Sequence, residues 1–181
     1  MVARASWLLL GLMLVGAVQA LELHSPDIVD GQRIPEKQVF NGFGCTGGNV
    51  SPALHWSGEP GATKSFAITM HDPDAPTGSG WWHWVVFNIP ASVHELEAGA
   101  GDPALRRMPA GVVQSRTDFG KPGYGGPCPP KGHGTHHYHL TLYALDTPSL
   151  PLDQNAPAAM VGYYLNQHAL ARATLTGLYS R

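Results

Sequence analysis

Hydrophobic and polar residues alternate along much of this chain, and a period of two is typical of β-strands. In residues 64–71, Phe66, Ile68 and Met70 share one face of the predicted strand. Continuing the same parity one step further places Asp72 on the Met70 side. The pattern therefore predicts a strand that carries an acidic residue at its end, on the face that packs into the core.

A second alternating segment, residues 136–145, contains three histidines and two tyrosines. His136 and Tyr138 fall on one face of this predicted strand. His137 and His139 fall on the other face. The pleat thus divides the histidine cluster, which weakens the interpretation that it is a single metal site.

Residues 155–172 are the one segment where helical spacing is clear, and a closing strand is predicted at 174–179. The stripe that follows helical spacing is predicted to pack into the core. Its members are Met160, Tyr163, Tyr164 and Gln167.

The composition favours short strands joined by many turns, because 22 Gly and 16 Pro accompany only 13% charged residues. Short strands are predicted at 21–28, 39–43 and 112–116. The expected fold class is mainly β, within a β-rich α+β arrangement. No basic patch stands out and the net charge is −2, so nucleic acid is not expected as a partner.

Residues 1–20 have the features of a secretory signal peptide. They hold one basic residue, Arg4, then an apolar run too short to span a bilayer, and small residues before a cut after Ala20. A permanent anchor would need a longer apolar run. We therefore expect export to the periplasm and a single mature domain of residues 21–181, with no transmembrane segment.

Cys45 and Cys128 are the only cysteines, and both lie in glycine-rich loops. In an oxidising compartment such a pair favours a disulfide over a reactive thiol. The bond is expected to hold two irregular loops together.

The stretch from 71 to 90 holds an unusual set of polar residues beside a predicted buried strand. Asp72 and Asp74 are two apart, so they point to one side of an extended chain. His83 follows at the mouth of the apolar run. A small polar pocket is one interpretation, and a Pro-rich hairpin with an Asx-turn is the other. The pocket interpretation predicts a cis bond before Pro73 or Pro76.

Several motifs in this order resemble the phosphatidylethanolamine-binding protein family, also called the Raf kinase inhibitor protein family. They are Ser51–Trp56, Asp72-Pro-Asp-Ala-Pro76, Trp82-His83, Gly123–Pro130 and His136-x-Tyr138. With its signal and two cysteines, the chain is most similar to the exported YbhB/YbcL branch. The resemblance covers the whole mature chain.

The resemblance implies a large antiparallel sheet packed on a smaller one, with a few peripheral helices. It also implies a pocket for phosphate-like anions or phospholipid headgroups. The pocket residues carried over are Asp72, Asp74, His83, His136 and Tyr138, with Pro76 and Gly125 shaping the walls. Where eukaryotic members usually have Arg, this chain has His137, which argues against binding of phosphorylated peptides or kinases.

The residue types in the predicted pocket also indicate how it would bind an anion. Carboxylates beside imidazoles favour the imidazolium form, so Asp72 and Asp74 are expected to orient and charge His83 and His136. The cationic rings, Tyr138 and loop N–H groups would then bind the anion.

Three classes of function compete on the sequence. The first is a binding or inhibitor module that takes an anionic headgroup or a loop of a partner protein. The second is a hydrolase that uses His and Asp, which lacks a convincing nucleophile motif. The third is a periplasmic metal-binding protein based on residues 133–139. We expect the first, without a cofactor and without catalytic residues.

Overall fold

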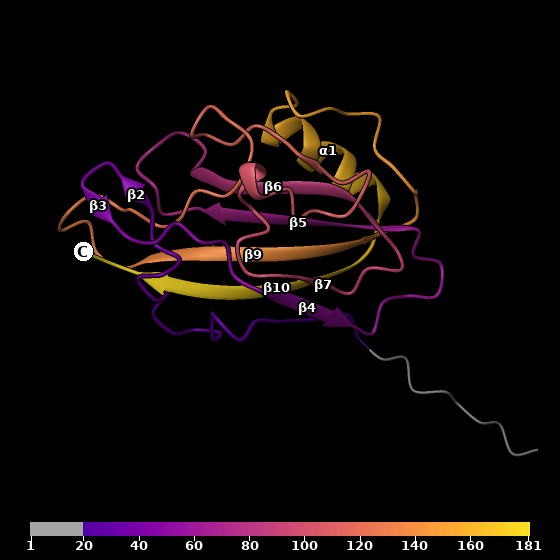
Figure 1. Ribbon diagram of the computed structural model, residues 1–181, viewed down its shortest axis with the longest axis horizontal. Coiled ribbons are helices and arrows are strands. Elements are labelled where there is room, and N and C mark those ends of the chain that lie inside the picture. The colour runs from indigo at the N-terminus through magenta and orange to yellow at the C-terminus, as the bar shows by residue number, and fades with distance from the viewer. Residues whose placement is uncertain (1–19) are drawn as a thin grey trace, which may run out of the picture.

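The computed structural model describes residues 20–181, which form a mainly β structure with one α-helix. Its large sheet has five antiparallel strands in the spatial order β10-β9-β5-β6-β8. These strands are β5 Ser65–Asp72, β6 Trp81–Pro90, β8 Val113–Gln114, β9 His136–Leu145 and β10 Ala169–Tyr179. The long strands run side by side across the molecule (Figure 1). The predicted fold class is confirmed.

Two smaller sheets complete the β structure. One has the order β1-β4-β7, formed by Glu22–His24, Leu54–Ser57 and Glu95–Leu96. The other pairs β2, Asn41–Gly42, with β3, Cys45–Thr46, and a single 3-10 turn spans Pro103–Leu105. These strands are shorter than the sequence pattern predicted, because Pro and Gly interrupt the pairing.

The large sheet is covered by hydrophobic side chains on both faces. Phe66, Ile68 and Met70 of β5 pack into the same cluster as Trp56 of the small sheet. On the opposite face, Ala67 packs in a second cluster with Val161 and Leu165 of the helix. The central strand β5 is therefore buried along almost its whole length, which holds its final residue in a fixed position.

The helix α1, Ala158–His168, packs against the sheet by a different stripe from the one predicted. Met160 and Tyr163 are 48% and 60% exposed, so the prediction that they pack into the core is wrong. Smaller residues take that place and let the helix approach the sheet closely. They are Ala158, Val161 and Leu165. The helix also ends earlier than predicted, because β10 begins at Ala169.

All peptide bonds in residues 20–181 are trans, so the predicted cis bond before Pro73 or Pro76 is wrong. Side-chain hydrogen bonds close the turn after β5 instead. Oδ1 of Asp72 accepts the N–H of Asp74 at 2.9 Å, which forms an Asx-turn. The acidic side chains therefore reach their positions without an unusual peptide bond.

The predicted signal peptide, apart from Ala20, lies outside the described residues. Cleavage after Ala20 and export therefore stay predictions. Within the part of the chain that the structure describes, no helix has the length and apolar character needed to span a bilayer.

Candidate functional site

A cavity of about 220 Å³ opens at one end of the large sheet. It lies where β5 ends and where β6 and β9 begin, because antiparallel neighbours reverse direction at the same edge. Asp72 ends β5, His83 lies near the start of β6, and β9 begins with the segment that carries His136 and Tyr138. All four side chains line the cavity, so residues far apart in sequence meet in one place.

A chain of hydrogen bonds leads from the cavity wall to the surface. Nδ1–H of His136 donates to Oδ2 of Asp72 at 2.7 Å. Nε2 of His136 lies 2.8 Å from Nδ1 of His133, so one proton is held between these two rings. Asp72 and His136 are only 2% and 1% exposed, whereas His133 is exposed. The buried carboxylate is thus partnered, as a buried charge must be.

Asp74, which was expected in the pocket, points away from it. Its carboxylate accepts both the backbone N–H and the ring Nδ1–H of His137, at 2.8 and 2.7 Å. The hydrogen bond from this ring is the main reason that the pKa of Asp74 lies below its ordinary value. Both side chains are largely exposed. Asp74 therefore pairs with the outer face of β9, while Asp72 pairs with the inner face.

The imidazole of His83 is held from behind by the glycine-rich loop. Its Nδ1–H donates to the carbonyl of Gly125 at 2.7 Å, and the N–H of Gly125 donates back to the carbonyl of His83 at 2.9 Å. Gly125 does not line the cavity, whereas Pro76 does. A Cβ at Gly125 would overlap the ring of Phe119, so glycine is required for the loop to lie this close.

The expectation that His83 is cationic is wrong for this environment. Burial lowers the pKa of His83 from 6.5 to about 4, and this outweighs the charge of Asp72, which raises it. The ring is therefore neutral near pH 7. Since Nδ1 carries the proton that Gly125 accepts, Nε2 of the neutral ring carries a lone pair.

Tyr138 lines the cavity, and its enclosed hydroxyl makes no hydrogen bond of ordinary length and angle among the described residues, although the Asp72 carboxylate lies close enough to interact with it. The residue is fully buried. Burial, followed by the nearby charge of Asp72, raises the pKa of Tyr138 well above its ordinary value, so the phenol stays protonated. Its ring meets that of His83 edge to face, with centroids 5.1 Å apart. A buried unpaired hydroxyl is costly, so this group calls for a ligand or water.

Three amides of the glycine-rich loop, which the sequence analysis expected to bind the anion, are instead bonded within the protein. Besides the bond from Gly125 to His83, the N–H of Gly126 donates to Oδ1 of Asn49 at 2.8 Å. The N–H of Tyr124 donates to the carbonyl of Gly101 at 2.8 Å. These three amides hold the loop in place and are not free to bind an anion.

An aromatic rim, formed by Phe43, Trp81 and Phe119, surrounds the mouth of the cavity and was missed by the sequence analysis. The rings of Phe43 and Phe119 stack with centroids 5.9 Å apart. Phe43 is 68% exposed and has a φ of 52°, which is rare for a bulky residue. Its position two residues before Cys45 was the available signal, because the cysteine is tied to the other loop.

The predicted disulfide between Cys45 and Cys128 is confirmed. Cys128 and the two prolines that follow it line the cavity. The C-terminal Arg181 strengthens the same wall, since its guanidinium donates to the carbonyl oxygens of Pro129 and Phe43. The disulfide therefore fixes one wall of the candidate site against the aromatic rim.

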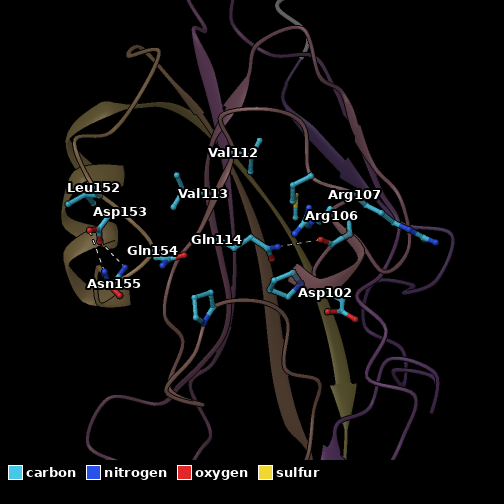
Figure 2. A pocket seen from close by; sticks show the side chains of 14 residues that line it. Asp102, Arg106, Arg107, Val112, Val113, Gln114, Leu152, Asp153, Gln154 and Asn155 are labelled. Atoms are coloured by element: carbon cyan, nitrogen blue, oxygen red, sulfur yellow. Dashed lines mark hydrogen bonds between the residues drawn. The ribbon is translucent and has the colours of Figure 1, made fainter.

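A larger cavity of about 590 Å³ lies elsewhere on the surface. Figure 2 shows Gln114 near its centre, Asp153 and Asn155 beside α1, and Arg107 on the opposite side. Some of its polar groups already have local partners. The side-chain oxygen of Gln114 accepts the indole N–H of Trp84, and the carboxylate of Asp153 accepts the N–H of Asn155. None of the predicted site residues lies there, so the smaller cavity is the candidate site.

For the metal-binding alternative, residues 20–181 contain no group of three His, Cys, Asp or Glu side chains arranged to hold a metal ion. His137 and His139 lie on the outer face of β9, as the alternation predicted. Nδ1 of His139 is hydrogen-bonded to the hydroxyl oxygen of Thr176 at 2.9 Å.

Comparison with known proteins agrees with this architecture. The family model described as "Phosphatidylethanolamine-binding protein" matches residues 24–180. YbcL of Escherichia coli strain K12 is 52% identical over 160 residues, covering 88% of this chain and 87% of YbcL. YbhB of the same organism is 51% identical over 160 residues, covering 88% of this chain and all of YbhB.

Solved structures give the same result. The crystal structure of Escherichia coli YbcL has a TM-score of 0.87 at 51% identity, over 89% of this chain and 98% of that one. A homologue from Chlamydia trachomatis has a TM-score of 0.75 at 30% identity, over 90% of this chain and 99% of that one.

Proposed function

Because the chain belongs to the phosphatidylethanolamine-binding protein family, we propose that it is an exported binding protein for a phosphate-like anion. The anion is taken by the pocket around His83 and Tyr138, either free or as part of a phospholipid headgroup. One observation carries the proposal: Tyr138 lines the cavity beside the ring of His83, and its buried hydroxyl makes no hydrogen bond of ordinary geometry in the described chain.

The size of the cavity supports a small ligand group. Its volume of about 220 Å³ is below the range of about 300–1,000 Å³ that is typical of pockets for drug-sized ligands. A single headgroup suits this volume. The aromatic rim gives an apolar surface for whatever is attached to the headgroup, since aromatic side chains contribute large buried areas at binding sites.

The electrostatics of the pocket favour an anion of low charge. Among the described residues that line it there is no Lys or Arg, and Asp72 brings a negative charge. The hydrogen bond from His136 offsets that charge at 2.7 Å. Neutral donors such as the Tyr138 hydroxyl then bind the anion, as they do in many oxyanion sites.

Binding without turnover is part of the proposal. Both cysteines are joined in the disulfide. Apart from Tyr138, the one hydroxyl group among the described lining residues belongs to Thr77, and it donates to the carbonyl of Gly80. The ligand, or a partner protein that presents an anionic group, would therefore be held rather than cleaved.

Calorimetric titration with phosphate and with phosphoethanolamine at pH 6 tests the function. Tyr138→Phe removes only the hydroxyl and should weaken binding about tenfold or more, because a hydrogen bond to a charged group contributes about 1.5–3 kcal/mol. Tyr124→Phe is the matched control, since that buried hydroxyl donates to the carbonyl of Gln38 outside the cavity. Absence of binding, or equal affinity in Tyr138→Phe, would overturn the proposal.

A further inference from the structure

The protonation of His83 is fixed by its surroundings. A carbonyl oxygen only accepts hydrogen bonds, so the 2.7 Å contact with Gly125 requires a proton on Nδ1. Nε2 makes no hydrogen bond to the protein in residues 20–181, and the ring lines the cavity. The neutral ring therefore presents an acceptor to the ligand.

We propose that the pocket binds only oxyanions that carry a proton of their own. The ligand donates this O–H to Nε2 of His83 and accepts the O–H of Tyr138. Inorganic phosphate and phosphate monoesters satisfy this rule. Sulfate and phosphate diesters, including the diester of an intact phospholipid, have no O–H to give. This inference rests on the proposed function and narrows its ligand to a protonated phosphate group.

The groups that face His83 support this arrangement. β5 contributes the Asp72 carboxylate, and β9 contributes His136 and Tyr138; His71 of β5 does not line the cavity and has only a minor electrostatic effect on His83. The loop behind it adds the Gly125 carbonyl. Burial is the largest effect and lowers the pKa of His83 to about 4, so the ring stays neutral from pH 6 to pH 8. A fully deprotonated oxyanion would meet both a lone pair and a carboxylate.

The chemistry of phosphate fits this requirement near neutral pH. The second pKa of a phosphate monoester is about 6, so one O–H is present in a large fraction of molecules at pH 6 and in few at pH 8. A site built to pair with a hydroxyl strongly rejects analogues that lack it, because its own polar group is left unpaired. Affinity for a monoester should therefore fall as the pH rises from 6 to 8.

Two matched ligand pairs test the inference on the wild-type protein. Methyl phosphate is compared with dimethyl phosphate, and inorganic phosphate with sulfate, by calorimetric titration at pH 6. We expect dimethyl phosphate and sulfate to bind about 100-fold more weakly than their partners. A cationic His83 would instead accept all four anions. If sulfate or dimethyl phosphate binds with an affinity within a few-fold of that of the protonated ligand in its pair, the requirement for a ligand O–H is overturned, while the phosphate site stays in place.

The failures of the two proposals are distinguishable. If none of the four ligands binds, both the proposed function and the requirement for a ligand O–H are wrong. A direct readout needs neither ligand nor variant: ¹⁵N NMR of the His83 imidazole at pH 6 to 8 should report a protonated Nδ1 and an unprotonated Nε2. A protonated Nε2 would overturn the inference.

Discussion

The buried imidazole of His83 predicts a loss of stability in acid. Its pKa in the fold, about 4, lies below the ordinary value of 6.5 that applies to the unfolded chain. Between these values the unfolded chain binds a proton that the folded protein does not. The contribution of His83 to the free energy of unfolding is therefore fully present above pH 6.5 and is lost as the pH falls towards 4.

The magnitude follows from the two pKa values. They differ by about 2.5, and one pKa unit corresponds to about 1.36 kcal/mol, which gives roughly 3 kcal/mol for complete protonation. Over the range from pH 7 to pH 4, where the folded ring is half protonated, the free energy of unfolding should fall by about 3 kcal/mol from this residue alone. That is a large part of the stability of an ordinary domain, about 5–15 kcal/mol.

Unfolding in guanidinium chloride at pH 7, 5.5 and 4, followed by tryptophan fluorescence, measures this loss. His83→Gln removes the titrating group, and the exposed His55→Gln is the matched control. Carboxylates titrate alike in all three proteins, so their effect cancels in the comparison. Wild type and His55→Gln should lose about 3 kcal/mol more than His83→Gln. An equal loss in all three proteins would refute a neutral, buried His83.

Three further predictions concern the walls of the cavity. Replacing Cys45 and Cys128 by Ser should lower the free energy of unfolding by about 2 to 4.5 kcal/mol, and the upper figure is about what the chain-entropy model gives for a separation of 83 residues. Reductant should destabilise the wild type and leave the double variant unchanged. A loss below about 1 kcal/mol in denaturant unfolding would contradict this prediction. Gly125→Ala should weaken phosphate binding several-fold in calorimetry, since its Cβ overlaps the Phe119 ring; unchanged affinity would show that the ring does not shape the cavity. Asp72→Asn should also weaken phosphate binding, although it removes a negative charge, because the carboxylate orients the imidazole it holds at 2.7 Å; tighter binding at both pH 6 and pH 8 would exclude this role.

The period of hydrophobic residues predicted which side chains enter the cavity. Alternation along β9 places His136 and Tyr138 inside and His137 outside, because a pleated strand leaves no other choice once Leu140 and Leu142 are in the core. The same parity carried Asp72 to the inner face at the end of β5. The disulfide was also predictable, since the chain has no other thiol.

The partners and charges of these side chains were not predictable. Asp72 and Asp74 are two apart, yet they bind different histidines, because the Asx-turn between them redirects the second carboxylate to the outer face. The neutral state of His83 depends on burial, and the position of its remaining ring proton depends on a carbonyl 42 positions away. Local sequence carries no sign of either. The predicted helix stripe was wrong because the side of α1 that packs on the sheet carries Ala158, Val161 and Leu165.

The placement of the cavity at the ends of three adjacent strands has a consequence for how the protein reaches its native state. Asp72 and His136 are separated by 64 positions, and β5 lies between a strand from the same hairpin and one from the far half of the chain. Contacts of such long range form late and slowly, since loop closure must precede them. A chain with only the β5–β6 hairpin would present His83 without Tyr138. Ligand affinity should therefore appear only when the last strands dock, which makes binding a marker of completed folding.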